Sequence, residues 1–103
     1  MGVRMTGSTL SVLKVLLTGP AREMYGLEIA EDAGLASGTA YPILMRLERE
    51  GWVQARWEEI DESEVGRRRR RYYLLTALGV TEAKRAFANR KPVVIWRLGG
   101  ATS

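Results

Sequence analysis

The hydrophobic period of this chain changes at Gly51, from that of a helix to that of a strand. Before Gly51, apolar residues recur at the i, i+3, i+4 and i+7 spacing of a helix buried on one side: Ala40, Ile43, Leu44 and Leu47. After it, apolar and polar residues alternate over 52–57, which is typical of a strand with one buried face. The chain therefore combines helices and strands, and the helices come first.

Two further helices are predicted upstream. The first covers residues 9–17, with Ser8 or Thr9 as its N-cap. Gly19 and Pro20 end it, because proline restricts the residue before it and cannot continue a helix. The second covers about 24–33, where a mostly apolar face opposes an acidic one.

The connection to the third helix is short, with Gly34 at the position expected for a helix C-terminal glycine. The third helix covers 38–50, and Ser37 or Thr39 is its N-cap. Pro42 favours the later cap, because near a helix start its missing N–H costs nothing. Two helices joined by about four residues are typical of a helix-turn-helix.

A β-hairpin and a fourth helix are predicted after Gly51. Residues 58–66 are polar and acidic and form a loop, and 69–75 form the second strand. Thr76 caps a helix over 77–90, which Pro92 ends. The residues of this helix expected to be buried are Leu78, Ala83, Ala86 and Phe87.

The predicted fold class is therefore mainly α with a small β-hairpin, a winged helix-turn-helix in the order helix, helix, helix, strand, strand, helix. We expect a flexible N-terminus over 1–8, a single DNA-binding domain over 9–90, and a dimer-associated C-terminal tail over 91–103. A chain of 103 residues has no room for a second domain.

Cysteine and histidine are both absent. Disulfides, thiol catalysis and most metal sites are therefore excluded, and the commonest general base is missing. We expect a binding protein without metal or cofactor, not an enzyme. No apolar run reaches the ~18 residues of a membrane-spanning helix, and residues 1–8 have no signal-peptide core, so we expect a soluble cytoplasmic protein without a membrane partner.

The net charge of +4 is unevenly distributed. Residues 1–51 hold five basic and six acidic residues, and 52–103 hold eleven basic and six acidic residues. Five of those bases form one run, Arg67 to Arg71, which favours a polyanion partner. Strand alternation would put Arg67, Arg69 and Arg71 on one face, so we expect two or three phosphate contacts. The acidic stretch Glu58–Glu64 is expected to balance this charge across the hairpin.

Three motifs, in this order, closely resemble the PadR family of transcriptional regulators. They are Gly38-Thr39-Ala40-Tyr41-Pro42, the segment from Arg46 to Gly51, and the segment from Tyr72 to Gly79. The upstream Gly19-Pro20 and Tyr25-Gly26 segments are also similar, and the resemblance covers roughly 9–88.

The resemblance implies a homodimeric repressor whose third helix and wing contact double-stranded operator DNA, and a small-molecule effector. Pro92 ends the last helix earlier than is usual in the family. We therefore expect dimerisation through the first and fourth helices and the tail. The candidates for contact with a second subunit or an effector are Leu10, Leu13, Phe87 and Trp96.

The candidate DNA-binding residues are Ser37, Thr39, Tyr41, Arg46, Arg49, Arg67, Arg68, Arg69 and Arg70. Several have an alternative role. Ser37 and Thr39 can act as caps, Tyr41 can pack against the core, and Arg46 can pair with Glu50. Arg49 lies late in its helix, so it contacts a phosphate or solvent rather than a base. The alternative function is a winged-helix module that binds an acidic protein partner.

Overall fold

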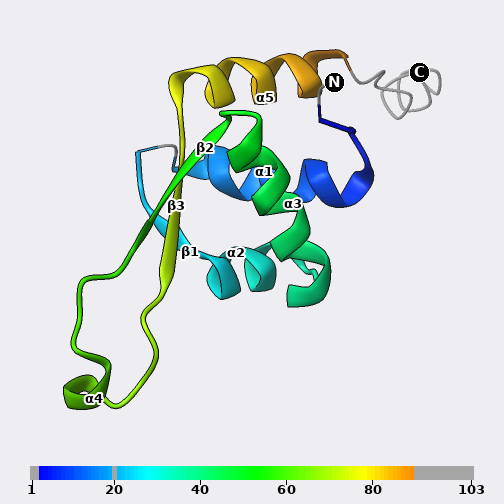
Figure 1. Ribbon diagram of the computed structural model, residues 1–103. Coiled ribbons are helices and arrows are strands. Elements are labelled where there is room, and N and C mark those ends of the chain that lie inside the picture. Colours follow the sequence, from blue (N-terminus) through cyan, green and yellow to red (C-terminus); the bar gives the residue numbers. More distant parts are fainter. Residues whose placement is uncertain (1–2, 20, 90–103) are drawn as a thin grey trace.

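The computed structural model describes residues 3–19 and 21–89. Within these residues, four longer helices and one short helix are interleaved along the chain with three strands, which form one antiparallel sheet (Figure 1). The predicted fold class, α-rich with a small sheet, is confirmed. The elements are α1 Gly7–Thr18, β1 Met24–Tyr25, α2 Gly26–Ala33, α3 Ser37–Arg49, β2 Val53–Trp57, α4 Glu62–Val65, β3 Arg71–Leu75 and α5 Ala77–Asn89.

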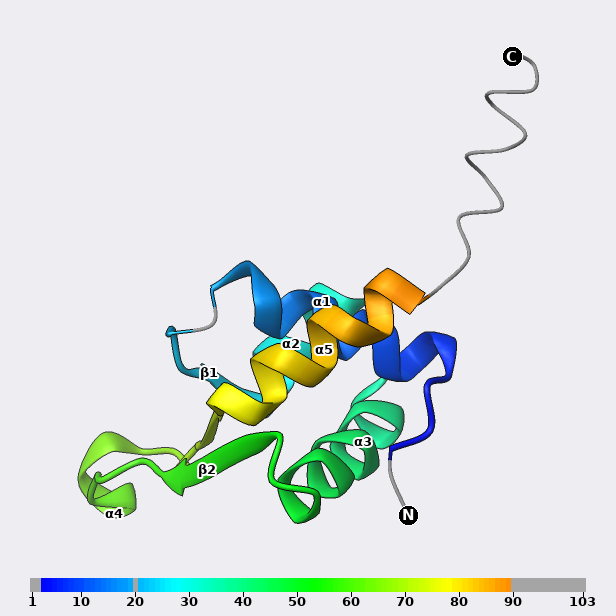
Figure 2. The same cartoon turned by 90° about the horizontal axis from the view of Figure 1, so that it is seen from above.

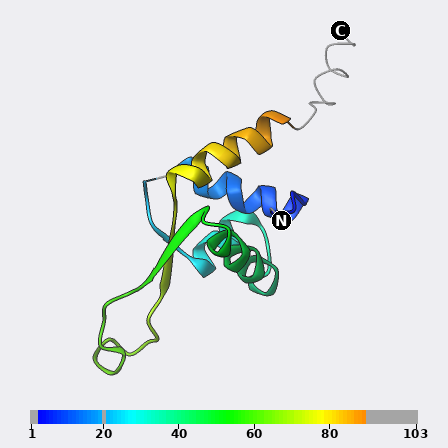
Figure 3. The ribbon, with the colours of Figure 1, turned by 45° about the horizontal axis from the view of Figure 1, so that its top comes forward.

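The helices α1, α2, α3 and α5 pack around one core, which the inner face of the sheet closes. Leu44 and Leu47 of α3 are fully buried, as the i, i+3, i+4, i+7 pattern predicts. Figure 2 and Figure 3 show α5 crossing beside α1, while β2 and β3 extend away from the helices and carry α4 at their tip. We call this projecting hairpin, residues 53–75, the wing.

Leu10 and Leu13 belong to this core. Leu13 has no exposed surface and Leu10 is 6% exposed, so the chain's own packing already covers both side chains. This burial leaves little of either side chain for contact with a second subunit or an effector, and the expected contact stays a prediction. Phe87 is half-buried against the same core, and Trp96 lies outside the described residues.

The sheet has a strand that sequence reasoning missed. Met24 and Tyr25, predicted as the start of a helix, pair with Tyr73 and Tyr72 of β3. Burial of Met24, which is 1% exposed, favours the extended backbone over one more helical turn. The helix begins at Gly26, where the Tyr25 N–H donates to the Glu28 carboxylate at 3.4 Å, and it ends at Gly34 with φ +71°.

Two predicted N-caps are also wrong. Thr6 caps α1 by accepting from the Thr9 N–H at 3.1 Å, so α1 starts inside the segment expected to be flexible. Met5 also packs against the core. Ala36 is the N-cap residue of α3 and makes no side-chain bond, which places Pro42 inside the helix rather than in its first turn. There its missing N–H removes one bond of the helix ladder.

The wing tip is more ordered than the predicted loop. Asp61 accepts from the backbone N–H groups of Ser63 at 3.0 Å and Glu64 at 3.3 Å, which nucleates the single turn α4. The second strand starts at Arg71, not at residue 69. Residues 67–70 therefore lie outside the strand, and the expected alternation of the five arginines between two faces does not hold.

Thr76 caps the start of α5 at the end of the wing, as predicted. Its hydroxyl accepts from the Gly79 N–H at 2.9 Å, as an N-cap should. Leu78, predicted to be buried, is 49% exposed, whereas Ala83 is fully buried. Gly79 is buried instead of Leu78, because the backbone of Trp52 lies directly against it.

Candidate nucleic-acid interface

The outward face of α3 is exposed. Gly38, Pro42, Met45 and Arg49 follow one another at i, i+4, i+7 and i+11, and all four are exposed. They lie opposite the buried stripe, as expected for an amphipathic helix. Ser37 and Thr39 are exposed at the start of the same helix. An exposed helix of this kind, preceded by α2 and a short turn, is the element that enters a major groove in helix-turn-helix proteins.

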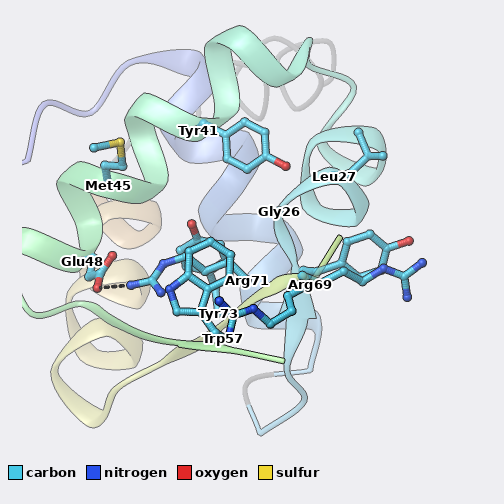
Figure 4. A pocket seen from close by; sticks show the side chains of 11 residues that line it. Gly26, Leu27, Tyr41, Met45, Glu48, Trp57, Arg69, Arg71 and Tyr73 are labelled. Atoms are coloured by element: carbon cyan, nitrogen blue, oxygen red, sulfur yellow. Dashed lines mark hydrogen bonds and ion pairs between the residues drawn. The ribbon is translucent and has the colours of Figure 1, made fainter. Parts of the chain in front are cut away.

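A groove of about 720 Å³ separates α3 from the stem of the wing, the name used here for residues 53–58 and 67–75 (Figure 4). Its walls come from the start of α2, from α3 and from the facing strands of the wing. The lining residues are Tyr25, Gly26, Leu27, Tyr41, Met45, Glu48, Trp57, Arg69, Arg70, Arg71 and Tyr73.

Tyr41 lies over Gly26 on one side of the groove. A Cβ atom added at Gly26 would stand 2.3 Å from Cε1 of the Tyr41 ring, so the ring takes this position because residue 26 has no side chain. The ring thus packs against α2 while 38% of the residue remains exposed. The packing role considered for Tyr41 is therefore present, and its contact with DNA stays a prediction.

Two of the five consecutive arginines form close ion pairs within the chain. Arg67 donates from both terminal nitrogens to the Glu58 carboxylate, at 2.7 Å and 3.0 Å. Arg71 donates to Glu48 of α3 at 3.0 Å, which links the wing to that helix. These two guanidinium groups are partly buried and serve the structure of the wing.

The other three arginines are more available. Arg69 reaches Glu62 at 3.8 Å and lies 5.6 Å from the centre of the Trp57 ring. Arg70 stacks over Tyr25 at 4.2 Å. Within residues 3–19 and 21–89, no carboxylate pairs with Arg68 or Arg70. These side chains are the ones whose charge a phosphate could neutralise.

The acidic residues of the wing balance its charge, as the sequence predicts. The Arg67 guanidinium, and to a smaller degree the Arg70 backbone N–H, lower the pKa of Glu58 to about 2. The carboxylate therefore stays ionised at any physiological pH. Because Glu58 also accepts from the Arg70 N–H at 3.1 Å, it fixes the backbone path of the arginine run.

Arg46 and Arg49 add two positive charges at the C-terminal end of α3. In the described part of the chain neither forms an ion pair, so the alternative pairing of Arg46 with Glu50 is not present. Both lie in the last turn, where cations also interact favourably with the helix dipole.

Three residues of this site were not predicted from the sequence. Met45 and Trp57 are 57% and 52% exposed, and side chains of this kind carry no charge that would single them out in the sequence as part of a site. Trp57 does share a strand face with Val53 and Ala55, but it lies beyond the edge of the core. Glu48 could not be recognised because its partner, Arg71, is distant in the sequence.

Other kinds of site find no support among the described residues. No group of three or more acidic, cysteine or histidine side chains there is arranged to hold a metal ion. In the same part of the chain, no helix has the length and apolar character needed to cross a membrane.

The sequence pattern of the transcriptional regulator PadR-like family matches residues 12–85. The chain belongs to this family. No curated protein sequence matches it at a significant level. The resemblance predicted from the three motifs is thereby confirmed, and a DNA-binding regulator is the function class of the family.

Solved structures of winged-helix regulators have the same fold. A MepR mutant from Staphylococcus aureus superposes with a TM-score of 0.70 at 16% identity, over 93% of this chain and 65% of that one. A transcriptional regulator homologue from Pyrococcus horikoshii gives 0.66 at 26% identity, over 84% and 78%. The PadR family regulator from Eggerthella lenta gives 0.64 at 24% identity, over 89% and 80%. The chain spans about two thirds of the MepR structure.

Proposed function

We propose that this protein is a sequence-specific regulator of transcription that binds double-stranded DNA as a homodimer and acts in the cytoplasm as a repressor. The observation that carries the proposal is the exposed outward face of α3 beside the arginines of the wing stem, in a chain of the PadR-like family. A neutral helix start flanked by unpaired cations fits a major groove flanked by phosphates.

In the proposed complex, α3 lies in the major groove and the wing stem follows the sugar-phosphate backbone. Ser37, Thr39 and Tyr41 would contact the duplex from the start of α3, and Arg46 and Arg49 from its end. Arg68, Arg69 and Arg70 would contact phosphates, with Arg67 holding the backbone of the run in place through Glu58. A two-fold dimer would place two such helices in successive major grooves, about 10 base pairs apart.

The test is fluorescence anisotropy of the full chain on the duplex upstream of its own gene and on a scrambled duplex of the same composition, over a salt series. We expect preference for the upstream duplex and a steep loss of affinity with salt, because each phosphate contact releases counterions. Equal binding to both would contradict specificity for that target. Absence of binding at low salt, together with capture of an acidic protein, would favour the alternative interaction module.

A further inference from the structure

The first two turns of α3 lack every side chain that reads bases by paired hydrogen bonds. From Ser37 to Met45 there is no arginine, lysine, asparagine, glutamine, aspartate or glutamate. Guanine and adenine are usually recognised in the major groove by bidentate contacts from four of these residue types. The part of the helix that inserts most deeply therefore cannot use the common hydrogen-bond code.

Beyond the exposed hydroxyls of Ser37 and Thr39, the exposed surface of this segment is apolar. Pro42 and Met45 lie on the central line of the outward face, and Met45 is 57% exposed. Tyr41 and Leu27 extend this surface across the mouth of the groove, at 38% and 46% exposed. Figure 4 shows Tyr41 and Met45 projecting from α3 on the side of the groove. Four of the six large hydrophobic residues with the greatest exposure in the described chain, Trp57 included, line this one groove.

The charge around this surface indicates what covers it. Arg69 and Arg70 border the groove on the wing side, and Arg49 continues the outward line of α3. Glu48, the acidic residue in the lining, is already paired with Arg71. A strip with cations on both sides is complementary to a major groove, where the base edges lie between two rows of phosphates.

One base edge in the major groove is apolar, the C5-methyl group of thymine. We propose that α3 reads thymine methyl groups through Met45 and Pro42, and that Met45 is a specificity-determining residue for thymine-containing half-sites. The methionine side chain is long and unbranched, so it can extend to a methyl group that a shorter side chain does not reach. This inference rests on the proposed function, because it requires α3 in the major groove.

The experiment begins with selection of bound duplexes from a random-sequence pool by the full chain. Single thymines of a recovered half-site are then replaced by deoxyuridine, which keeps the base pair and removes only the methyl group. We expect about fourfold weaker binding for each contacted thymine, the cost of losing one buried methyl group. Met45→Ala should bind thymine and uracil duplexes equally at the position that Met45 contacts, whereas Met45→Leu should keep a preference for thymine there.

Leu78→Ala is the matched control, since it removes an equally exposed apolar side chain from α5. It should leave the discrimination between thymine and uracil intact. Equal binding of thymine and uracil duplexes by the unmodified chain would overturn the inference while leaving the proposed function standing. Recovery of half-sites without thymine would overturn it as well. A pool from which no duplex is recovered would instead reject the proposed function, and this inference with it.

Discussion

The five consecutive arginines of the wing differ in their surroundings, although they are identical in the sequence. Arg67 and Arg71 hold the wing together through Glu58 and Glu48, whereas Arg68 is exposed and pairs with no carboxylate among the described residues. Exposed ion pairs contribute little to stability, but a partly buried bidentate pair fixes geometry. The run therefore contains two arginines that form structural ion pairs, Arg67 and Arg71, and others, such as Arg68, that are available to bind DNA.

Arg68→Ala should weaken DNA binding by a similar factor on every sequence. The salt dependence, measured as the slope of log K against log [salt], should become less steep by about one unit per subunit, because one phosphate contact is lost. Anisotropy titrations over a salt series measure it. Arg85→Ala removes the same charge from α5 and should leave the slope unchanged. An unchanged slope for Arg68→Ala would show that Arg68 contacts no phosphate.

The ion pair of Glu58 makes the stability of the folded chain depend on pH. The pKa of Glu58 is lowered from 4.5 to about 2 by Arg67, so the pair stabilises the folded chain fully above pH 4.5. That stabilisation is lost as the pH falls through the folded-state pKa. Urea unfolding from pH 6 to pH 2 should therefore find Glu58→Gln less stable at pH 6, with the two curves converging near pH 2.

The other carboxylates with lowered pKa values provide the internal control for this comparison. Glu23, paired with Arg56, and Asp61, bonded to Ser63, are present in both proteins and contribute the same background acid dependence. A constant difference between the two curves across the range would contradict the role given to Glu58.

At the scale of elements, the joins between helix and sheet fix where the wing points. The Trp52 N–H donates to the Leu47 carbonyl at the end of α3, and the Thr76 N–H donates to the Trp52 carbonyl at the start of α5. Gly79 lets α5 approach this point, since an added Cβ would stand 1.9 Å from the Trp52 oxygen. One backbone residue therefore links α3, the wing and α5.

Gly79→Ala should destabilise the chain by roughly 3 kcal/mol, because rigid backbone rather than a flexible side chain must move to relieve the overlap. Urea unfolding measures the change. Gly38→Ala is the matched control, since nothing lies within 4 Å of the added Cβ and alanine favours helix more than glycine does. A Gly79→Ala protein as stable as the unmodified one would contradict the close packing at Trp52.

An element can be predicted from the sequence when the interactions that form it lie between residues close together in the chain. The helix α3 and the change at Gly51 follow from periodicity, and the cap at Thr76 from its own neighbours. The strand β1 could not be predicted, because two residues become a strand only by pairing with β3, far along the chain. The turn α4 is too short to carry a period. The exposure of one face of α3 could also be predicted, because it follows from the periodicity of the helix itself. The ion pairs of Arg67 and Arg71 could not, because they depend on how the wing folds.

At the scale of the whole molecule, the described chain has a helix α3 with an uncharged start beside a basic stem, and an acidic tip at the far end of the wing. This order of charge suits a duplex that contacts α3 and the stem together, since the acidic tip would be repelled by phosphates and lie beyond them. We therefore expect α3 to lie in the major groove and α4 at the edge of the site.

The most direct test of this placement uses the absence of cysteine, which allows a single DNA-cleaving iron chelate to be attached at a chosen residue. Gly38→Cys puts the chelate on the outward face of α3, and Glu64→Cys puts it on α4. We predict that the first cleaves within each half-site and the second only in the flanking sequence. Cleavage by the α4 chelate within the half-sites, or uniform cleavage by both, would contradict the account.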